Sequence, residues 1–147
     1  MQPELVIKDT AELTPQEVIT IMRARVAVFV VEQNCPYQEV DAKDETARHV
    51  ILWQDGQLAA YTRIIPHDDG VHISFGRVLV VAQFRRQHLG RQIVAATIAE
   101  IQRLHPGRAI KIQAQDYLRQ FYGSFGFTAV SATYLEDGIP HVDMVLE

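Results

Sequence analysis

A short basic turn is the part of this sequence whose residue types most clearly predict chemistry. It runs from Phe84 to Arg91 and holds three arginines, at positions 85, 86 and 91. The apolar run Val78–Val81 precedes it and an amphipathic pattern follows, so we expect a strand, a turn and a helix N-terminus in succession. The first N–H groups of a helix have no partner within it, and the helix dipole adds about half a positive charge there. The sequence therefore predicts an anion site suited to a phosphate or pyrophosphate.

The same arginines have a structural alternative, in which Arg85, Arg86 and Arg91 form a solvated cluster at a helix start. Cationic side chains near a helix N-terminus oppose the dipole, and this unfavourable placement favours a bound anion over the alternative. An anion site of this kind also needs a scaffold that holds the turn beside a sheet.

Hydrophobic periodicity predicts a mixed α/β scaffold, an α+β sheet with helices on its faces. Thr14 and Glu17 form a capping box, and the helix that follows is expected to end near residues 31–33. Gly76 within a long strand predicts a bulge or a close backbone approach, and Gly126 predicts a left-handed helix stop. The expected strands cover residues 5–7, 49–53, 58–65, 71–81, 109–112, 127–134 and 142–146, and the other helices cover 93–104 and 117–125.

Length and composition predict one soluble domain over residues 1–147. The 147 residues are 48% hydrophobic and 22% charged, which is ordinary for a globular chain with a real core. A net charge of −4 argues against a nucleic-acid binder, which would need a basic face. No apolar run approaches the roughly 20 residues that span a bilayer, and the start lacks signal-peptide features, so we expect a cytoplasmic protein without membrane contact.

Cysteine and histidine usage excludes two further classes of site. The single cysteine, Cys35, rules out an internal disulfide framework and a multi-cysteine zinc site. The six histidines lack zinc-ligand spacing, so we predict no metal. Pro36 favours an extended Cys35, and no His-Asp pattern accompanies it, which disfavours a catalytic thiol.

Three blocks of sequence resemble a known family. They are residues 29–37 with Glu39 and Asp41; Val78–Val80 through Arg85 and Leu89-Gly90; and Gln115 through Phe127, followed by residues 136–141. Together they resemble the GNAT superfamily of acetyltransferases and, within it, the ElaA-like branch. The resemblance implies the GNAT acyl-CoA N-acyltransferase fold, a central, mostly antiparallel, twisted sheet with helices on both faces. It also leaves room for a homodimer.

The turn departs from the family's acyl-CoA motif at one position. The motif usually reads Arg/Gln-x-x-Gly-x-Gly/Ala, and its first glycine is replaced by His88 here. Glycine would relax the local dihedral angles and let the backbone approach the pyrophosphate. A histidine fits this position if its φ is negative and its ring points outward, and it could also add a phosphate contact.

The resemblance implies acetyl-CoA as co-substrate and assigns its contacts. The pyrophosphate would bind main-chain N–H groups of Arg86, Gln87, His88, Leu89, Gly90 and Arg91, with added charge from Arg85, Arg86 or Arg91. Main-chain groups of Val78, Leu79 and Val80 would bind the pantetheine arm and the thioester carbonyl. Gln115 would contact the cofactor, or would simply be a polar residue at a helix start.

The family also implies a general acid, Tyr122, for the departing thiolate. A phenol near pKa 10 and a thiol near 8.5 make direct proton transfer uphill by about 1.5 units, or roughly 2 kcal/mol. Tyr122 could therefore only donate a hydrogen bond, with water assisting. The structural alternative is a core tyrosine on the apolar side of its helix.

An acceptor ammonium near pKa 10.4 must lose a proton before it attacks, so a base is expected. The candidates are Glu32, Glu39, Asp41, His72 and His141. Glu32 and His141 rank first because they fall in the branch-like blocks. Their structural alternatives are a surface acid at a helix end and a strand histidine bonded to backbone.

The expected function is acetyl transfer from acetyl-CoA to a small amine or a peptide by direct attack. We expect the acids at 32, 39, 41 and 44 to suit a cationic acceptor. A non-catalytic acyl-CoA-binding or sensor module is the alternative, supported by His88. An interaction domain without a nucleotide ligand is a third reading.

Overall fold

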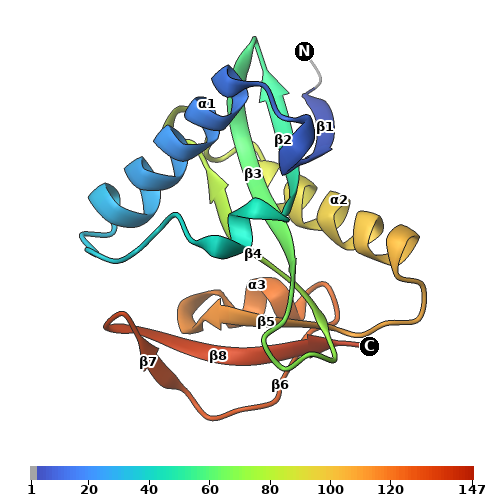
Figure 1. Ribbon diagram of the computed structural model, residues 1–147. Coiled ribbons are helices and arrows are strands. Elements are labelled where there is room, and N and C mark those ends of the chain that lie inside the picture. Colours follow the sequence, from blue (N-terminus) through green and yellow to red (C-terminus); the bar gives the residue numbers. More distant parts are fainter. Residues whose placement is uncertain (1–2) are drawn as a thin grey trace.

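A computed structural model describes residues 3–147 as a twisted sheet with helices on both of its faces (Figure 1). The strands are β1 (Glu4–Asp9), β2 (Arg48–Gln54), β3 (Gln57–Pro66), β4 (Ile73–Val80), β5 (Ile110–Gln115), β6 (Thr128–Ala129), β7 (Tyr134–Glu136) and β8 (Ile139–Leu146). They follow the order β1-β2-β3-β4-β5-β8-β6, and β7 pairs with β8. All these pairs are antiparallel except β4 with β5, which confirms the predicted fold class.

The helices begin largely where the sequence predicts them. They are α1 (Pro15–Arg25), the π-helix η2 (Val26–Glu32), α2 (Leu89–Leu104) and α3 (Arg119–Gly123), with 3₁₀ turns η1 (Thr10–Glu12), η3 (Ala42–Glu45), η4 (Ala82–Phe84) and η5 (Asp116–Leu118). The predicted capping box is confirmed, because the Thr14 hydroxyl accepts from the Glu17 N–H at 3.1 Å and the Glu17 carboxylate accepts from the Thr14 N–H at 2.8 Å.

The end of the first helix differs from a regular α-helix. It ends at Glu32, within the predicted range, but its last seven residues form a π-helix. Wider i→i+5 bonds continue past its end, from the N–H of Gln33 to the Val28 carbonyl and from that of Cys35 to the Val30 carbonyl. Such π-turns are frequent at functional sites, and no feature of the sequence had indicated one here.

The expected strand over residues 127–134 was wrong. Only Thr128–Ala129 and Tyr134–Glu136 are strands, and the chain between them leaves the regular ladder. The Ser131 hydroxyl accepts the hydrogen bond of the Asp143 N–H at 2.9 Å, so a side chain replaces the backbone partner that a continuous strand would supply. The predicted stop at Gly126 is confirmed by its φ of +100°.

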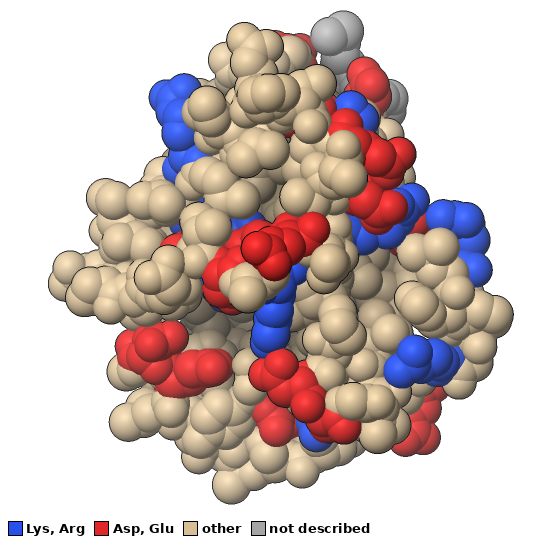
Figure 2. Space-filling model, viewed as in Figure 1, with Lys and Arg blue, Asp and Glu red and all other residues tan. Residues whose placement is uncertain are grey.

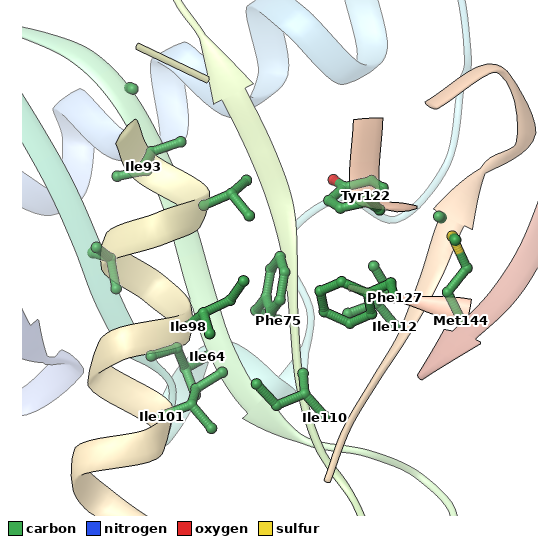
Figure 3. Close-up of a cluster of buried hydrophobic side chains, with 14 of the residues drawn as sticks. Ile64, Phe75, Ile93, Ile98, Ile101, Ile110, Ile112, Tyr122, Phe127 and Met144 are labelled. Carbon is green, nitrogen blue, oxygen red and sulfur yellow. The ribbon is translucent and has the colours of Figure 1, made fainter. Parts of the chain in front are cut away.

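Two hydrophobic clusters lie on opposite faces of the sheet, because successive strand residues point to opposite sides. On one face α1 and η2 place Ile21 and Phe29 against Ile51, Tyr61 and Leu79. On the other face α2 and α3 cover residues that include Val50 and Phe75. Figure 3 shows that cluster, in which Ile98 of α2 lies beside the Phe75 ring and the rings of Tyr122 and Phe127 lie on the other side of Phe75.

β4 and β5 separate soon after they meet. Their only paired residues are Ile73 and Ile110, at the start of both strands, and the parallel ladder goes no further within residues 3–147. The sheet therefore opens between the C-terminal ends of these two strands.

Candidate active site

The opening between β4 and β5 forms a cleft of about 770 Å³. Its lining comes from the end of η2 and the loop after it, from β3 and β4, from the basic turn, from the β5–α3 segment and from the β7–β8 hairpin. The lining residues include Glu32, Gln33, Cys35, Tyr37, Arg77, Val78, Leu79, Val80, Arg85, Gly90, Ala114, Gln115, Tyr122, Glu136, Asp137 and His141. Figure 2 shows a hollow on this face, with acidic side chains around η3 on one side and around the β7–β8 turn on the other.

A β-bulge shapes the β4 wall of the cleft. Tyr61 of β3 pairs with Leu79, whereas Arg63 pairs with Gly76, so two residues of β4 lie opposite one residue of β3. Arg77 within the bulge has a φ of +51°. A bulge bends its strand and leaves one residue outside the ladder. The irregularity predicted at Gly76 is therefore confirmed, and it lies directly before Val78.

The basic turn adopts a left-handed backbone at two positions. Arg86 has a φ of +68° and His88 a φ of +62°, and His88 is the N-cap of α2. The condition set for His88, a negative φ, was wrong: the chain keeps the left-handed conformation that glycine favours, at a cost of roughly 1 kcal/mol, and histidine is one of the side chains enriched there. Buried Leu89 anchors the turn, and a backbone that changes between left- and right-handed residues can direct successive N–H groups at an anion.

Two of the three turn arginines are already held by protein groups. Arg85 donates to both carboxylate oxygens of Glu32, at 2.7 and 2.8 Å, and its Nε donates to the Val80 carbonyl at 3.0 Å. Arg91 donates to the Ser124 hydroxyl at 2.6 Å and lies over the Phe125 ring. Arg86 forms no hydrogen bond or ion pair within residues 3–147 and is exposed. Arg86 is therefore the turn side chain that is free for an anion.

Glu32, one of the two leading base candidates, lies at the mouth of the cleft. The hydrogen bond from Arg85 lowers the pKa of the Glu32 carboxyl despite the opposing effect of burial. A carboxylate held this way is a poorer proton acceptor than a free one.

The acids of the loop after η2 lie in a closed ring of ion pairs, here called the charge ring. Its members alternate in sign in the order Arg25, Glu39, Arg77, Asp41, Arg63 and Asp44. The acids were expected to attract a cationic amine, but three arginines compensate three carboxylates. The sequence analysis missed the arginines because they come from α1, β3 and β4, far from the loop in the chain.

His72 and Cys35 both have structural contacts, and His72 also lies outside the cleft. His72 does not line the cleft, and its Nδ1 lies 2.7 Å from a carboxylate oxygen of Asp69. Cys35 is buried, and its thiol donates to the Asp137 carbonyl at 3.5 Å. This contact joins the loop after η2 to the β7–β8 turn.

Tyr122 belongs to both the core and the cleft. Its ring packs against Phe121, Phe127 and Phe75 with centroids 5.1, 6.0 and 6.3 Å away. Figure 3 shows its hydroxyl on the side of the ring that faces β4. Burial, with a smaller contribution from Tyr117, raises the pKa of Tyr122 well above its usual value. The phenol therefore stays protonated at neutral pH and can only donate or share its hydrogen.

His141 and Gln115 are cross-strand partners on β8 and β5, at the edge of the cleft. Nδ1 of His141 lies 2.7 Å from the carbonyl oxygen of Ile139. Because a carbonyl oxygen only accepts, this contact places the hydrogen on Nδ1 and leaves the lone pair on Nε2. Gln115 ends β5, makes no cap hydrogen bond, and donates a long bond of 3.4 Å to Gln33.

Two classes of feature are absent from the part of the chain that the structure describes. Residues 3–147 contain no group of three or more His, Cys, Asp or Glu side chains arranged to hold a metal ion. No helix among the same residues is both long and apolar enough to cross a bilayer.

Comparisons with known proteins identify the family and agree with the fold. Residues 9–147 match the family described as the acetyltransferase (GNAT) domain. Protein ElaA of Escherichia coli is 40% identical over 140 residues, which cover 93% of this chain and 92% of ElaA. The crystal structure of that protein superposes with a TM-score of 0.92, 38% identity and 99% coverage of both chains.

A second solved structure is equally similar. An acyl-CoA N-acyltransferase from Pseudomonas aeruginosa gives a TM-score of 0.92 at 39% identity, covering 97% of this chain and 98% of its own. The family match spans nearly the whole sequence, and each of the two solved structures aligns with at least 97% of this chain. The chain therefore belongs to the GNAT acetyltransferase family, as an acyltransferase of its ElaA-like branch.

Proposed function

We propose that this protein transfers an acetyl group from acetyl-CoA to an amine by direct attack of the amine on the thioester. The observation that carries the proposal is the cleft between β4 and β5, which brings the bulged edge of β4, Tyr122 and His141 to one cavity. The cavity, at about 770 Å³, lies within the range of roughly 300–1,000 Å³ usual for ligand sites.

The basic turn supports binding of the pyrophosphate. We assign this role to the main-chain N–H groups of residues 86–91, at the start of a 16-residue helix. Arg86 would add a charge-assisted hydrogen bond, while Arg85 and Arg91 would hold the turn in shape through Glu32 and Ser124. His88 would contribute its left-handed backbone rather than its ring.

The edge of β4 supports binding of the thioester. Main-chain groups of Val78, Leu79 and Val80 face an opening instead of a neighbouring strand, because β5 has separated from β4. A main-chain N–H aimed at the developing oxyanion in a water-poor site contributes about 3 to 4 kcal/mol. Gln115, across the opening at the end of β5, would contact the pantetheine arm.

Two side chains would handle the protons. Tyr122 stays protonated and would donate a hydrogen bond to the departing sulfur, with water completing the proton transfer. His141 would act as the general base, since Nε2 keeps its lone pair while Nδ1 is held by the Ile139 carbonyl. We assign Glu32 to positioning Arg85, because that ion pair lowers the pKa of its carboxyl.

The acceptor would approach from the β7–β8 side. Glu136 and Asp137 are the charged lining residues that form no ion pair within residues 3–147, whereas Glu32, Asp41 and Asp68 are each paired. Two uncompensated carboxylates favour a cationic amine, either a small amine or a peptide. A cytoplasmic location and a homodimer stay predictions from the sequence.

Release of the CoA thiol in the presence of a panel of amines tests the function. We expect amine-dependent thiol release and acetylated product by mass spectrometry. Tyr122→Phe should lower kcat by about 10²-fold, the smaller end of the usual acid–base contribution, and leave CoA affinity nearly intact. Because the aromatic ring of Tyr122 packs in the core, phenylalanine preserves this packing. A fall in kcat would then report the lost hydroxyl and not a loss of stability.

The alternatives predict different results in the same assay. A sensor module would bind CoA by calorimetry but release no thiol with any amine. An interaction domain would show neither heat nor a thermal shift on adding CoA or acetyl-CoA. Unchanged turnover in Tyr122→Phe would remove this side chain from the mechanism without affecting the family assignment.

A further inference from the structure

The charge ring closes on itself without a gap. Arg25 contacts Glu39 at 2.9 Å and Asp44 at 2.7 Å, and Arg63 contacts Asp44 at 3.0 Å and Asp41 at 2.7 Å. Arg77 completes the ring with an ion pair to Glu39 and a longer one of 3.5 Å to Asp41. Each guanidinium therefore meets two carboxylates.

The ring joins four segments that surround the cleft. Arg25 is the last residue of α1, before the π-helix; the three acids come from the loop through η3; Arg63 belongs to β3 and Arg77 to β4. Arg63 is also the β3 residue paired with Gly76, next to the bulge. The ring thus fixes the loop to both strands at the point where β4 changes register.

Such a ring is a poor way to gain stability alone. Arg25 is fully buried and Arg63 is 4% exposed, so their desolvation is costly, and apolar replacements of buried ion pairs are often neutral or stabilising. Many directional hydrogen bonds do, however, fix the relative positions of the groups that they join. The geometry of the ring therefore indicates a positional role.

Arg77 is the ring member nearest the chemistry. Its backbone has the left-handed φ of +51° inside the bulge, and its side chain lines the cleft. Nη2 donates to the Glu39 carbonyl at 2.7 Å, and the guanidinium lies over the Tyr37 ring, 5.3 Å from its centroid. One side chain thus ties the bulge to the loop that carries Cys35, Tyr37 and Glu39.

We propose that Arg77 is a positioning residue, which uses the charge ring to hold the bulged edge of β4 at a fixed distance from the acceptor-side loop. The edge at Val78–Val80 presents its main chain to the thioester in the proposed function, on which this inference rests. The loop lines the cleft through Cys35 and Tyr37, and the Cys35–Asp137 contact joins it to the β7–β8 turn, from whose side the amine would approach. Loss of Arg77 would let the edge and the loop shift relative to each other.

Arg77→Gln tests this role in the full-length chain. A misplacement of about 1 Å can lower turnover by up to about 10²-fold, so we expect kcat to fall at least tenfold and the acceptor KM to rise. The dissociation constant of CoA, measured by calorimetry, should stay within about twofold of the wild-type value, because the turn at 86–91 lies outside the ring. Arg77→Lys should recover part of kcat, since an ammonium can still reach Glu39.

Arg48→Gln is the matched control. Arg48 pairs with Glu100 at 2.6 Å and joins β2 to α2 without lining the cleft. It should lower the unfolding temperature but leave kcat and both binding constants unchanged. All assays are run at a temperature where circular dichroism shows each variant folded.

The outcomes separate this inference from the proposed function. If the wild-type protein binds CoA but acetylates no amine, the proposed function is wrong, and the positioning role that rests on it is wrong as well. With an active wild type, the positioning role is overturned if Arg77→Gln keeps kcat within about twofold, if Arg48→Gln loses as much kcat, or if CoA affinity falls in parallel.

Discussion

The arginines of the charge ring and the arginines of the basic turn differ in what surrounds them. Arg25 and Arg63 are buried, and each arginine of the ring meets two carboxylates that balance its charge. Arg85 and Arg86 lie at the surface, and Arg86 has no protein partner within residues 3–147. The same residue type therefore serves architecture in one region and stays available to a ligand in the other.

This difference changes how the charge near the cleft should be understood. The ring contains three cations and three anions, so its acids contribute little net field to an approaching amine. The uncompensated charges lie instead at the turn, where Arg86 is positive, and at the β7–β8 hairpin, where Glu136 and Asp137 are negative. The turn thus suits an anion such as a pyrophosphate, and the hairpin suits a cationic amine.

The largest expected effect is a difference in the free energy of unfolding between a variant of the charge ring and a variant of the basic turn. Arg25→Met should lower the free energy of unfolding by about 3 to 5 kcal/mol, because it leaves Glu39 and Asp44 buried with one arginine each instead of two. Arg86→Gln should change it by no more than about 0.5 kcal/mol, as for other exposed substitutions. Urea denaturation followed by circular dichroism measures both values. Similar losses in the two variants would show that the ring is not a structural element.

Acid should weaken the structure around the charge ring in two stages. Burial lowers the pKa of His49, which bonds Tyr61 beside the ring, to about 4. Burial alone would raise the pKa of Asp44, but hydrogen bonds from Arg25 and the Asp41 N–H lower it to about 2. Both groups bind protons more readily in the unfolded chain, so stability falls as pH falls.

Each group affects stability in the pH range between its ordinary pKa, which applies in the unfolded chain, and its lowered pKa in the folded protein. His49 should cost about 3 kcal/mol between pH 6.5 and pH 4, and Asp44 a further 2 kcal/mol or so between about pH 4 and pH 2. Urea denaturation at a series of pH values measures the curve. His49→Gln should flatten the upper window and Asp44→Asn the lower one. A curve that His49→Gln leaves unchanged would assign the upper window to another group.

A change at the turn should affect binding and spare stability. Gly90→Asp places a carboxylate in the first turn of α2, where it repels a pyrophosphate, and we expect CoA affinity to fall about tenfold or more. The helix dipole stabilises the same carboxylate, so the fold should be unaffected. Gly90→Ala is the control, because a Cβ there would lie 3.7 Å from Val80 in ordinary contact. Undiminished CoA affinity in Gly90→Asp would place the pyrophosphate elsewhere.

The order of helices and strands could be predicted because hydrophobic periodicity and caps such as Thr14 act within a few residues. The basic turn was also recognisable, since its arginines and its helix start are adjacent in sequence. The charge ring was not, because Arg25, Asp44 and Arg63 meet only after α1, the loop and β3 have packed. The left-handed backbone at His88 was missed for a related reason: the turn between η4 and α2 imposes the conformation, and histidine accepts it at a modest cost.

The smallest expected effect concerns Arg86 alone. An exposed charge pair contributes about 0.2 to 1 kcal/mol, so Arg86→Gln should weaken CoA binding by roughly twofold to fivefold at low salt. The difference should shrink at high salt, where screening shortens the range of exposed charges to about 3 Å at 1 M, whereas main-chain N–H contacts depend less on salt. Calorimetry at two salt concentrations measures this loss of CoA affinity. Arg77→Gln, in the charge ring, is the control, and its CoA affinity should show no such salt dependence. If Arg86→Gln binds CoA as tightly as the wild type at low salt, the main chain of the turn holds the pyrophosphate without side-chain charge, and the two arginine clusters differ in burial but not in ligand binding.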